Sequence, residues 1–419
     1  MTTPPPLRDD CFAMPPGVDW VPVDEALARL RAALTPVAAA ETVALDAALG
    51  RILAEPVHAA RAHPPEANAA VDGWGFAHAT LGPAPHRLPI APGRAAAGDP
   101  HRGEVPPGQA LRILTGAILP QGVDTVVLEE DTAADGTHVG FSRPPKPGAN
   151  TRPAGEDVRA GALILPEGRI LRPQDLGLAA ATGRAALAVR RPLRVAILST
   201  GDELQAPGEP AAPHQTYDAN RPMLAAIVRR WGMVPVDLGR AADTAGAVAA
   251  ALDRGAAEAD AILTSGGASA GDEDHVSAAL RSHGRLQTWR IAIKPGRPLA
   301  LATWNGTPVF GLPGNPVAAF VCTLVFARPA LLALAGAPWA EPRRLMLPAA
   351  FAKQKKPGRR EYLRARLTPE GAVETFRSEG SGRVSGLAWA DGLVELPDPA
   401  ATIAPGDPVR YLPFAAFGL

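Results

Sequence analysis

The sequence predicts a multidomain α/β plus β protein whose centre is a doubly wound, mostly parallel, three-layer domain. The chain has 419 residues, too many for a single hydrophobic core. From residue 193 onward, short apolar runs alternate with helix-length amphipathic segments, the pattern of a parallel sheet with crossover helices. Three loops rich in glycine, proline and polar residues follow three of these apolar runs, where ligands bind in such sheets.

The part of the chain before residue 193 predicts smaller, separate elements. Residues 23–34 have the spacing of an amphipathic helix, and a second apolar segment covers residues 43–53. From residue 65 to about residue 140, short strands broken by glycine and proline indicate a small β-rich domain. Residues 144–158 form a connector rich in proline and glycine.

The central region carries the regular alternation. The expected strands are 194–198, 234–238, 261–263 and 307–310, and the expected helices are 223–231, 245–254, 273–283 and 317–334. Residues 317–340 are apolar enough to raise the question of a membrane span, but Arg328-Pro329 interrupts them and a Gly-Asn-Pro turn precedes them. We therefore expect a buried helix there. Beyond residue 342, alternation at residues 362–367 predicts a compact C-terminal β domain.

Composition describes an ordinary globular protein. The formal net charge is zero, which argues against nucleic-acid and membrane-surface partners. Cys11 and Cys322 fit no disulfide or metal pattern, which suits a reducing compartment, and Cys322 lies in an apolar run typical of a core. The first ten residues contain no apolar signal segment, so we expect a cytoplasmic location.

A glycine-rich loop, residues 264–274, is the strongest single indication of function. It lies between an expected strand and an expected helix, so its backbone N–H groups can cradle a phosphate or another oxyanion. Asp272 and Asp274 follow the glycines and would repel such a ligand unless a divalent cation lay between them. The loop therefore predicts a phosphorylated ligand and Mg²⁺.

Acidic residues near the other strand ends leave two interpretations open. Asp202 and Glu203 follow a strand, either as a helix cap or as part of the ligand edge. The Asp243-Thr244 pair is either the N-cap of the next helix or a source of a metal-binding carboxylate. For Asp272 and Asp274 the metal role is favoured over capping.

Lysine is rare in this chain, since only five of the 42 basic residues are lysines. Lys294 stands in an apolar neighbourhood beside a rigid Pro-Gly turn, between Arg290 and Arg297, and this arrangement favours an oxyanion-binding turn. Lys353, Lys355 and Lys356 form a run that we interpret as solvated surface.

These motifs resemble those of the molybdopterin molybdenumtransferase (MoeA) family, which includes the E domain of gephyrin. The resemblance covers nearly the whole chain. It rests on Val71-Asp72-Gly73-Trp74, Leu114-Thr115-Gly116-Ala117, Gly155-Glu156-Asp157-Val158, Ser199-Thr200-Gly201-Asp202-Glu203-Leu204, Tyr217-Asp218-Ala219-Asn220, the loop 264–274, Lys294-Pro295-Gly296-Arg297-Pro298, Gly311-Leu312-Pro313-Gly314-Asn315-Pro316 and Gly358-Arg359-Arg360-Glu361-Tyr362.

The resemblance implies four parts. They are an elongated first domain (1–64 and 141–190), an inserted β-rich domain (65–140), a doubly wound molybdopterin-binding domain (191–340) and a C-terminal β-barrel-like domain (341–419). It also implies a homodimer with active sites shared between subunits. The implied reaction transfers molybdate onto adenylylated molybdopterin, releases AMP and needs Mg²⁺, with transient contacts to the adenylylating enzyme and to client enzymes.

Roles for individual residues follow from the same resemblance. The implied catalytic residues are Asp72, Thr115, Asp157, Glu203, Asp243, Asp274 and Lys294. The expected molybdopterin contacts are Thr200, Gly201, Asp218, Ser265, Gly266, Gly267, Ser269, Gly271, Pro313, Gly314, Asn315 and Pro316. Molybdate would be held by Arg290, Lys294, Arg297, Arg364 and Ser381, and Mg²⁺ by Glu203, Asp243, Asp272 and Asp274.

Two other functions compete with the molybdenum insertase. One is a paralogue that inserts tungsten or serves a single client enzyme, because the two oxyanions have nearly the same size and charge. The other is a molybdopterin-binding carrier or scaffold without catalysis, against which the acids and Lys294 argue.

Overall fold

The computed structural model describes residues 20–266, 275–282, 285–296 and 298–419. The chain forms two compact units. Unit 1 comprises the described residues up to Glu41, together with Gly50–Ile52 and Arg190–Leu419, and unit 2 comprises Thr42–Leu49 and Leu53–Val189.

The centre of unit 1 is a seven-stranded mixed sheet. Its strands in spatial order are β1 (Trp20–Val21), β19 (Arg285–Ile291), β21 (Pro298–Trp304), β22 (Thr307–Leu312), β18 (Ala261–Ser265), β14 (Arg194–Thr200) and β17 (Val234–Ala241). Strand β14 is parallel to both of its neighbours, and β18 is parallel to β22. Strand β21 is antiparallel to both neighbours. The sheet is therefore mostly parallel, as predicted, with an antiparallel hairpin that was not predicted.

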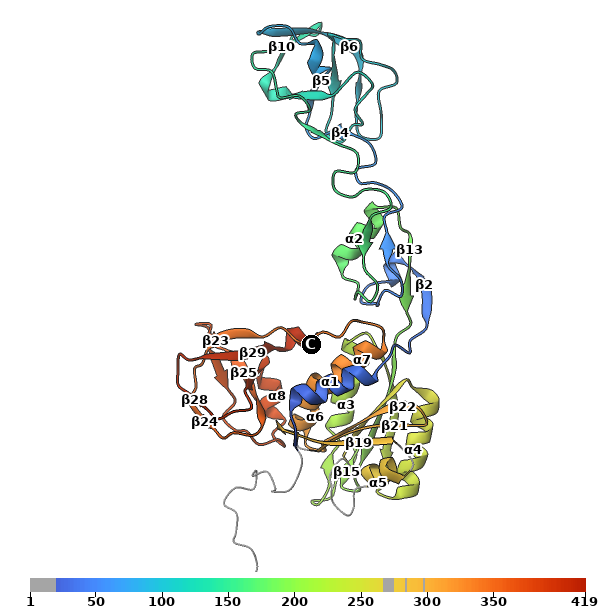
Figure 1. The fold of residues 1–419 in the computed structure, drawn as a ribbon, viewed down its shortest axis with the longest axis vertical. Coiled ribbons are helices and arrows are strands. Elements are labelled where there is room, and N and C mark those ends of the chain that lie inside the picture. Colours follow the sequence, from blue (N-terminus) through green and yellow to red (C-terminus); the bar gives the residue numbers. More distant parts are fainter. Residues whose placement is uncertain (1–19, 267–274, 283–284, 297) are drawn as a thin grey trace, which may run out of the picture. The chain divides into compact units, whose positions relative to one another are not determined.

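Helices cover both faces of this sheet because successive residues of its strands point to opposite sides. On β14, Val195 and Ile197 face one core while Ala196 and Leu198 face the other. The first core also contains side chains of α1 (Val23–Ala33), α3 (Asn220–Arg230), α6 (Pro316–Cys322) and α7 (Arg328–Leu334). The second contains side chains of α4 (Ala245–Glu258) and α5 (His275–Ser282), which lie together in Figure 1. The sheet therefore has helices packed on both of its faces.

The apolar helical stretch Pro316–Leu334 belongs to the first core. It runs through α6, a π-helical turn at Thr323–Ala327 and α7. By length and composition it could cross a membrane, but 83% of its most apolar window is buried inside the protein. The expectation of a buried helix is confirmed, and Cys322 is fully buried within it.

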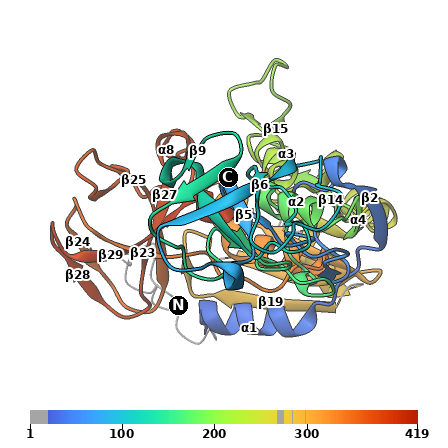
Figure 2. The same ribbon diagram turned by 90° about the horizontal axis from the view of Figure 1, so that it is seen from above.

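The C-terminal part of unit 1 forms a second, smaller sheet around its own apolar core. Its strand order is β20 (Ile293–Lys294), β25 (Arg360–Leu367), β27 (Gly392–Leu396), β29 (Pro408–Pro413) and β23 (Leu345–Pro348). Strand β26 (Val373–Thr375) pairs with β25, and β24 (Lys353–Lys355) pairs with β28 (Ala401–Ile403). Figure 2 shows β23, β24, β25, β27, β28 and β29 grouped together. Strand β20 comes from the central region, so it brings Lys294 into this sheet.

Unit 2 is built mainly from short strands. Its largest sheet contains β8 (Thr125–Leu128), β5 (Gly73–Phe76), β7 (Ala110–Ile113), β6 (His86–Ala95), β10 (His138–Phe141) and β9 (Ala133–Ala134). Three two-stranded pairs connect β11 (Thr151–Arg152) with β4 (Asn68–Ala69), β12 (Leu163–Leu165) with β3 (Val57–His58), and β13 (Ala186–Arg190) with β2 (Ala40–Ala44). Helix α2 (Pro173–Ala181) supplies Ala179 to a core of its own with Leu165 and Leu187.

One predicted boundary differs from the structure. The first domain was expected to include residues 1–64, but helix α1 belongs to unit 1. Val23, Ala26 and Leu30 of this helix are buried in the first core of unit 1, and α1 lies beside β19 in Figure 2. An amphipathic pattern shows that a helix has an apolar face, but it does not show which core that face joins. The rest of the four-part division stays a prediction.

Candidate active site

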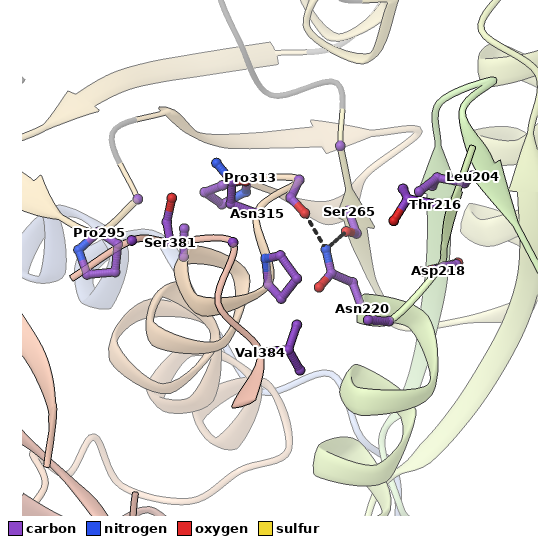
Figure 3. A pocket seen from close by; sticks show the side chains of 18 of the residues that line it. Leu204, Thr216, Asp218, Asn220, Ser265, Pro295, Pro313, Asn315, Ser381 and Val384 are labelled. Carbon is purple, nitrogen blue, oxygen red and sulfur yellow. Dashed lines mark hydrogen bonds between the residues drawn. The ribbon is translucent and has the colours of Figure 1, made fainter. Parts of the chain in front are cut away.

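A pocket of about 940 Å³ lies at the carboxyl ends of β14, β18 and β22, within unit 1. The strand ends contribute Thr200, Ser265 and Pro313. Figure 3 shows Ser265 and Asn220 on one side and Pro295 and Ser381 on another. The three strand-end motifs therefore meet as predicted, and the C-terminal sheet adds a further wall.

The backbone at Gly266 makes this edge compact. Its φ is +92°, a conformation that favours glycine, and a Cβ there would lie 2.6 Å from the carbonyl oxygen of Thr200. The Gly266 N–H donates to the carbonyl of Leu312 at 3.3 Å. A Cβ on Gly314 would lie 3.7 Å from the Gly266 Cα, so the loops after β18 and β22 approach closely.

Asn220 joins these loops through its carboxamide. Its Nδ2 donates to Ser265 Oγ at 2.7 Å and to the Gly314 carbonyl at 2.6 Å, as drawn in Figure 3. Its Oδ1 is buried and has no hydrogen-bond partner among the described residues. The Asp-Ala-Asn motif was recognised in the sequence, but only Asp218 was predicted as a contact. The position of the asparagine at the start of a helix opposite two ligand loops was the signal that could have identified it.

Asp218 itself has a structural contact in this wall. It is buried, and its carboxylate accepts hydrogen bonds from the Arg221 backbone N–H at 3.1 Å and from Arg221 Nε at 3.2 Å. These bonds satisfy a free N–H in the first turn of α3 and pair a buried charge. Asp218 thus holds the helix that presents Asn220.

The acids after β14 do not cap a helix. Asp202 and Glu203 lead into the short strand β15 (Leu204–Gln205), so the helix-cap alternative is wrong for both. Glu203 lines the pocket. Asp202 Oδ1 instead accepts from the backbone N–H of Asp243 at 3.3 Å.

The structure tests one of the two interpretations of the Asp243-Thr244 pair, the N-cap of the next helix. Thr244 is the N-cap of α4, and its hydroxyl accepts from Ala247 N–H at 3.3 Å. The Asp243 carboxylate therefore does not serve that cap. Within the part of the chain that the structure describes, no three His, Cys, Asp or Glu side chains cluster as a metal site. Asp272 and Asp274 lie outside the described residues, together with Gly267, Ser269, Gly271 and Arg297.

Two lysines and two glutamates form a closed ion-pair network beside the pocket. Lys294 Nζ lies 2.7 Å from Glu379 and 3.5 Å from Glu361. Lys353 lies 3.3 Å from Glu361 and also pairs with Glu379. Burial raises the pKa of Glu379, but the two ammonium groups outweigh it and hold that pKa below its ordinary value.

The prediction that Lys353 and Lys355 are solvated surface is wrong. The Lys353 side chain is 13% exposed, and Lys355 is 4% exposed. The Lys355 ammonium donates to the carbonyls of Lys356, Asp398 and Pro399 at 2.7–3.3 Å. Burial lowers its pKa because desolvation disfavours the charged form. Only Lys356 is exposed, as expected.

Arg364 stabilises the loop that forms the C-terminal wall of the pocket. Its guanidinium donates to the carbonyls of Arg383 at 2.7 Å and Gly380 at 3.1 Å, and also to that of Ser378. It is buried and does not line the pocket, whereas Ser381 does. Arg364 therefore holds the loop that carries Ser381. The Ser381 carbonyl accepts from the Val317 N–H at 3.0 Å, which attaches this loop to the start of α6.

The remaining predicted site residues lie at or near the same strand ends. Pro313, Gly314, Asn315 and Pro316 line the pocket, as expected. Gly201, with φ +134°, immediately follows β14 and precedes Glu203. Arg290 pairs through its backbone with Pro298 in the β19–β21 ladder.

Unit 2 contains three predicted catalytic residues on exposed loops. Asp72 Oδ1 accepts from the Thr115 hydroxyl at 2.6 Å and from the Thr115 N–H at 2.7 Å. These hydrogen bonds lower the pKa of Asp72. Asp157 lies within the connector motif, and its N–H donates to the His63 carbonyl at 3.1 Å. Asp72 and Thr115, which come from two different motifs, are thus in direct contact.

Comparison with known proteins covers nearly the whole chain. Residues 21–183 match the MoeA N-terminal region (domain I and II), residues 196–333 a probable molybdopterin binding domain, and residues 346–414 the MoeA C-terminal region (domain IV). The molybdopterin molybdenumtransferase of Haemophilus influenzae is 34% identical over 381 residues, which are 89% of this chain and 94% of that protein. The chain belongs to the molybdopterin molybdenumtransferase (MoeA) family. The resemblance inferred from the motifs is confirmed.

Other members of the family agree in sequence and in structure. Molybdopterin molybdenumtransferase 2 of Mycobacterium tuberculosis is 38% identical over 87% of this chain and 93% of its own length. The crystal structure of the molybdopterin biosynthesis MoeA protein from Pyrococcus horikoshii OT3 superimposes with a TM-score of 0.82 and 28% identity. It covers 94% of this chain and 100% of that one.

Proposed function

We propose that this MoeA-family chain is a molybdenum insertase that transfers molybdate onto adenylylated molybdopterin and releases AMP. The observation that carries the proposal is the single pocket that is lined both by the strand-end loops of the molybdopterin-binding region and by Lys294 and Ser381. The relatives named molybdopterin molybdenumtransferase support the same activity. The chain acts in molybdenum cofactor biosynthesis as a transferase.

The two sides of the pocket suit the two substrates. Gly266 and the neighbouring strand ends give close backbone approach, which suits the phosphate part of the pterin substrate. The buried Asn220 Oδ1 is an acceptor for an N–H group of the bound substrate. Lys294 and Ser381 offer an ammonium and a hydroxyl to molybdate, a tetrahedral dianion. Positioning both substrates in one pocket lowers the entropic barrier to transfer.

Mg²⁺ belongs to this proposal as a cofactor. The proposed ligands, Glu203, Asp243, Asp272 and Asp274, are all carboxylates, and hard oxygen ligands suit magnesium. Glu203 lines the pocket, and the Asp243 carboxylate is not used by the α4 cap. When bound, the ion would neutralise charge on the phosphate link that is cleaved. The protein residues then bind and orient the two substrates.

The assembly and the cellular setting are further parts of the proposal. We propose a homodimer in which Asp72, Thr115 and Asp157 of one subunit complete the pocket of the other. The protein would work in the cytoplasm and would contact the adenylylating enzyme and client molybdoenzymes transiently. The family resemblance supports these parts.

AMP release tests the proposed reaction directly. Purified protein is supplied with adenylylated molybdopterin, Mg²⁺ and either molybdate or tungstate, and AMP is measured by chromatography. We expect AMP release with molybdate, and a drop of roughly a hundredfold in Lys294→Met, which removes a charge in contact with the substrate. Lys146→Met, an exposed lysine in unit 2, is the matched control.

The same experiment separates the competing functions. Release with tungstate alone would support the tungsten-inserting paralogue. Tight binding of adenylylated molybdopterin without AMP release from either oxyanion would support the carrier and reject the insertase. Unchanged turnover in Asp274→Asn at limiting Mg²⁺ would remove that residue from the proposed metal site.

A further inference from the structure

The carboxylate of Glu379 is already an anion on the cationic side of the pocket. Glu379 lines the pocket together with Lys294 and Ser381, and its Oε2 accepts a hydrogen bond from Lys294 Nζ at 2.7 Å. Lys294 is the residue that the proposed reaction uses to hold molybdate. A dianion and the Glu379 carboxylate therefore compete for the same ammonium group.

The two carboxylates of the network offset the charge of its two lysines. Lys294 and Lys353 contribute two positive charges, and Glu361 and Glu379 contribute two negative charges. Each carboxylate offsets part of the positive potential that the lysines present to an incoming dianion, so loss of one carboxylate charge increases the attraction. The cationic side becomes available when one of the two carboxylates moves away.

Of the two carboxylates, Glu379 is the one that can leave. The Glu361 side chain is 8% exposed, and its residue pairs with Lys294 between β25 and β20. The Glu379 side chain is 43% exposed. Arg364 holds the backbone of the Glu379 loop by hydrogen bonds to the carbonyls on both sides of it, Ser378 and Gly380. Displacement therefore requires rotation of one side chain and no movement of the loop.

We propose that Glu379 is a resident counter-charge, which an oxyanion must displace from Lys294 before it can bind. The identification of that oxyanion as molybdate rests on the proposed function, but the competition does not. An anion that binds Lys294 more weakly than the Glu379 carboxylate does cannot displace that carboxylate and is excluded. Glu379 thereby opposes binding of abundant dianions such as sulfate as well as that of the substrate.

Direct anion binding tests the proposal. Equilibrium dialysis measures the dissociation constants of molybdate and of radiolabelled sulfate for the full-length wild type, Glu379→Gln, Glu379→Asp and Glu374→Gln. Glu379→Gln keeps the shape and removes the charge, so both anions should bind at least about tenfold more tightly. Glu379→Asp keeps the charge and should stay within about threefold of the wild type.

Glu374→Gln is the matched control because Glu374 lies on the same domain in an exposed pair with Arg366. It should also stay within about threefold of the wild type. Equal or weaker anion binding by Glu379→Gln would overturn the proposal and assign Glu379 to positioning Lys294. A gain of the same size in Glu379→Asp or Glu374→Gln would also overturn it.

The result can be read independently of the catalytic assay. If the wild type releases AMP but Glu379→Gln gains no affinity for either anion, the counter-charge proposal is wrong and the insertase proposal stands. If no AMP is released but Glu379→Gln gains affinity for sulfate and molybdate, the counter-charge stands and the insertase fails. If neither protein binds either anion, the counter-charge is rejected.

Discussion

A glycine at position 266 decides whether the strand ends can meet. Its positive φ and the 2.6 Å approach of an added Cβ to the Thr200 carbonyl give two separate penalties for any other residue. We expect Gly266→Ala to lower the free energy of unfolding by about 2–3 kcal/mol and to weaken binding of adenylylated molybdopterin. Urea denaturation and a direct binding titration measure the two effects.

Gly306 is the control for that prediction. It also has a positive φ, +84°, but a Cβ there would meet no atom of the described residues within 4 Å. Gly306→Ala should therefore cost only the conformational penalty, about 1 kcal/mol, and leave ligand binding unchanged. If the two variants lose equal stability, the contact with Thr200 has no energetic weight.

The ion pairs of Glu379 should make stability depend on pH. The pKa of Glu379 lies below its ordinary value of 4.5 in the folded protein, so its stabilising contribution is present above that value. The contribution is lost as the pH falls through the lowered pKa. We expect Glu379→Gln to be about 1 kcal/mol less stable than the wild type at pH 7, because the side chain is partly exposed.

Denaturation curves at a series of pH values test this expectation. The difference between the two proteins should shrink as the pH falls below 4.5 and Glu379 of the wild type becomes protonated. A difference that stays constant to about pH 3 would show that the glutamine acts through packing and not through charge.

At the scale of single residues, the sequence pattern gave some wrong predictions of burial. Lys353 and Lys355 looked like a surface run because consecutive basic residues are usually solvated. They occupy alternate positions on strand β24, and alternate residues of a strand point to the same side. A period-two pattern would have placed both side chains inward. Their carboxylate and carbonyl partners come from distant segments, so spacing alone could not identify them.

At the scale of the elements, the strands and helices around the site follow from local pattern. The expected strand 194–198 is β14 (Arg194–Thr200), and the expected helix 245–254 is α4 (Ala245–Glu258). The β19–β21 hairpin was not predicted because residues 290–298 were interpreted as an oxyanion-binding turn, from their charges and the rigid Pro-Gly sequence. The turn between β21 and β22 could also have been predicted, because its sequence, Asn305-Gly306, is a typical hairpin signal. Both residues have the positive φ that such a turn requires.

The loop after β26 depends on one buried side chain for its shape. Arg364 donates hydrogen bonds to three carbonyls of that loop, which a lysine cannot reproduce with one compact ammonium. We expect Arg364→Lys to lower the free energy of unfolding by about 2 kcal/mol and to raise the KM for molybdate by displacing Ser381. Chemical denaturation and AMP-release kinetics provide the measurements.

Arg366→Lys is the matched control, two residues further along the same strand. Arg366 is exposed, pairs with Glu374 on the neighbouring strand and lies over the Trp389 ring, so the substitution should cost less than about 1 kcal/mol. If Arg364→Lys leaves the KM unchanged while Arg366→Lys raises it, the loop is not held in the way described.

At the scale of the whole molecule, the family was accessible from the order of motifs. The unit to which α1 belongs could not be predicted, because the sequence of an 11-residue helix does not show which core its apolar face joins. Its attachment comes from long-range contacts such as Arg360 with Asp24, at 2.6 and 2.8 Å. Such contacts join residues separated by most of the chain.

The proposed shared active site predicts complementation between two inactive variants. Asp72→Asn disables a residue of unit 2, and Lys294→Met disables a residue of unit 1. If each site takes Lys294 from one subunit and Asp72 from the other, a mixed dimer contains one intact site. Coexpression at equal levels should then restore roughly a quarter of wild-type AMP release.

Size-exclusion chromatography with light scattering is the control that establishes the dimer and the exchange of subunits. Mixed dimers that remain inactive would show that each subunit builds its own site. A monomeric wild type with full activity would reject the shared site altogether.

The scarcity of lysine makes amine acylation a local probe. Of the five lysines, Lys146 and Lys356 are exposed, so acylating reagents should modify them in any state of the protein. Lys355 is buried with its ammonium bonded to three carbonyls and should resist modification until the chain unfolds. Lys294 and Lys353 are partly accessible, and their acylation rates, read by peptide mass spectrometry, report which anion holds them. The lysines of this protein thus report on its pocket. The acylation rates of two of them show whether an anion is bound, and the other three are reference positions.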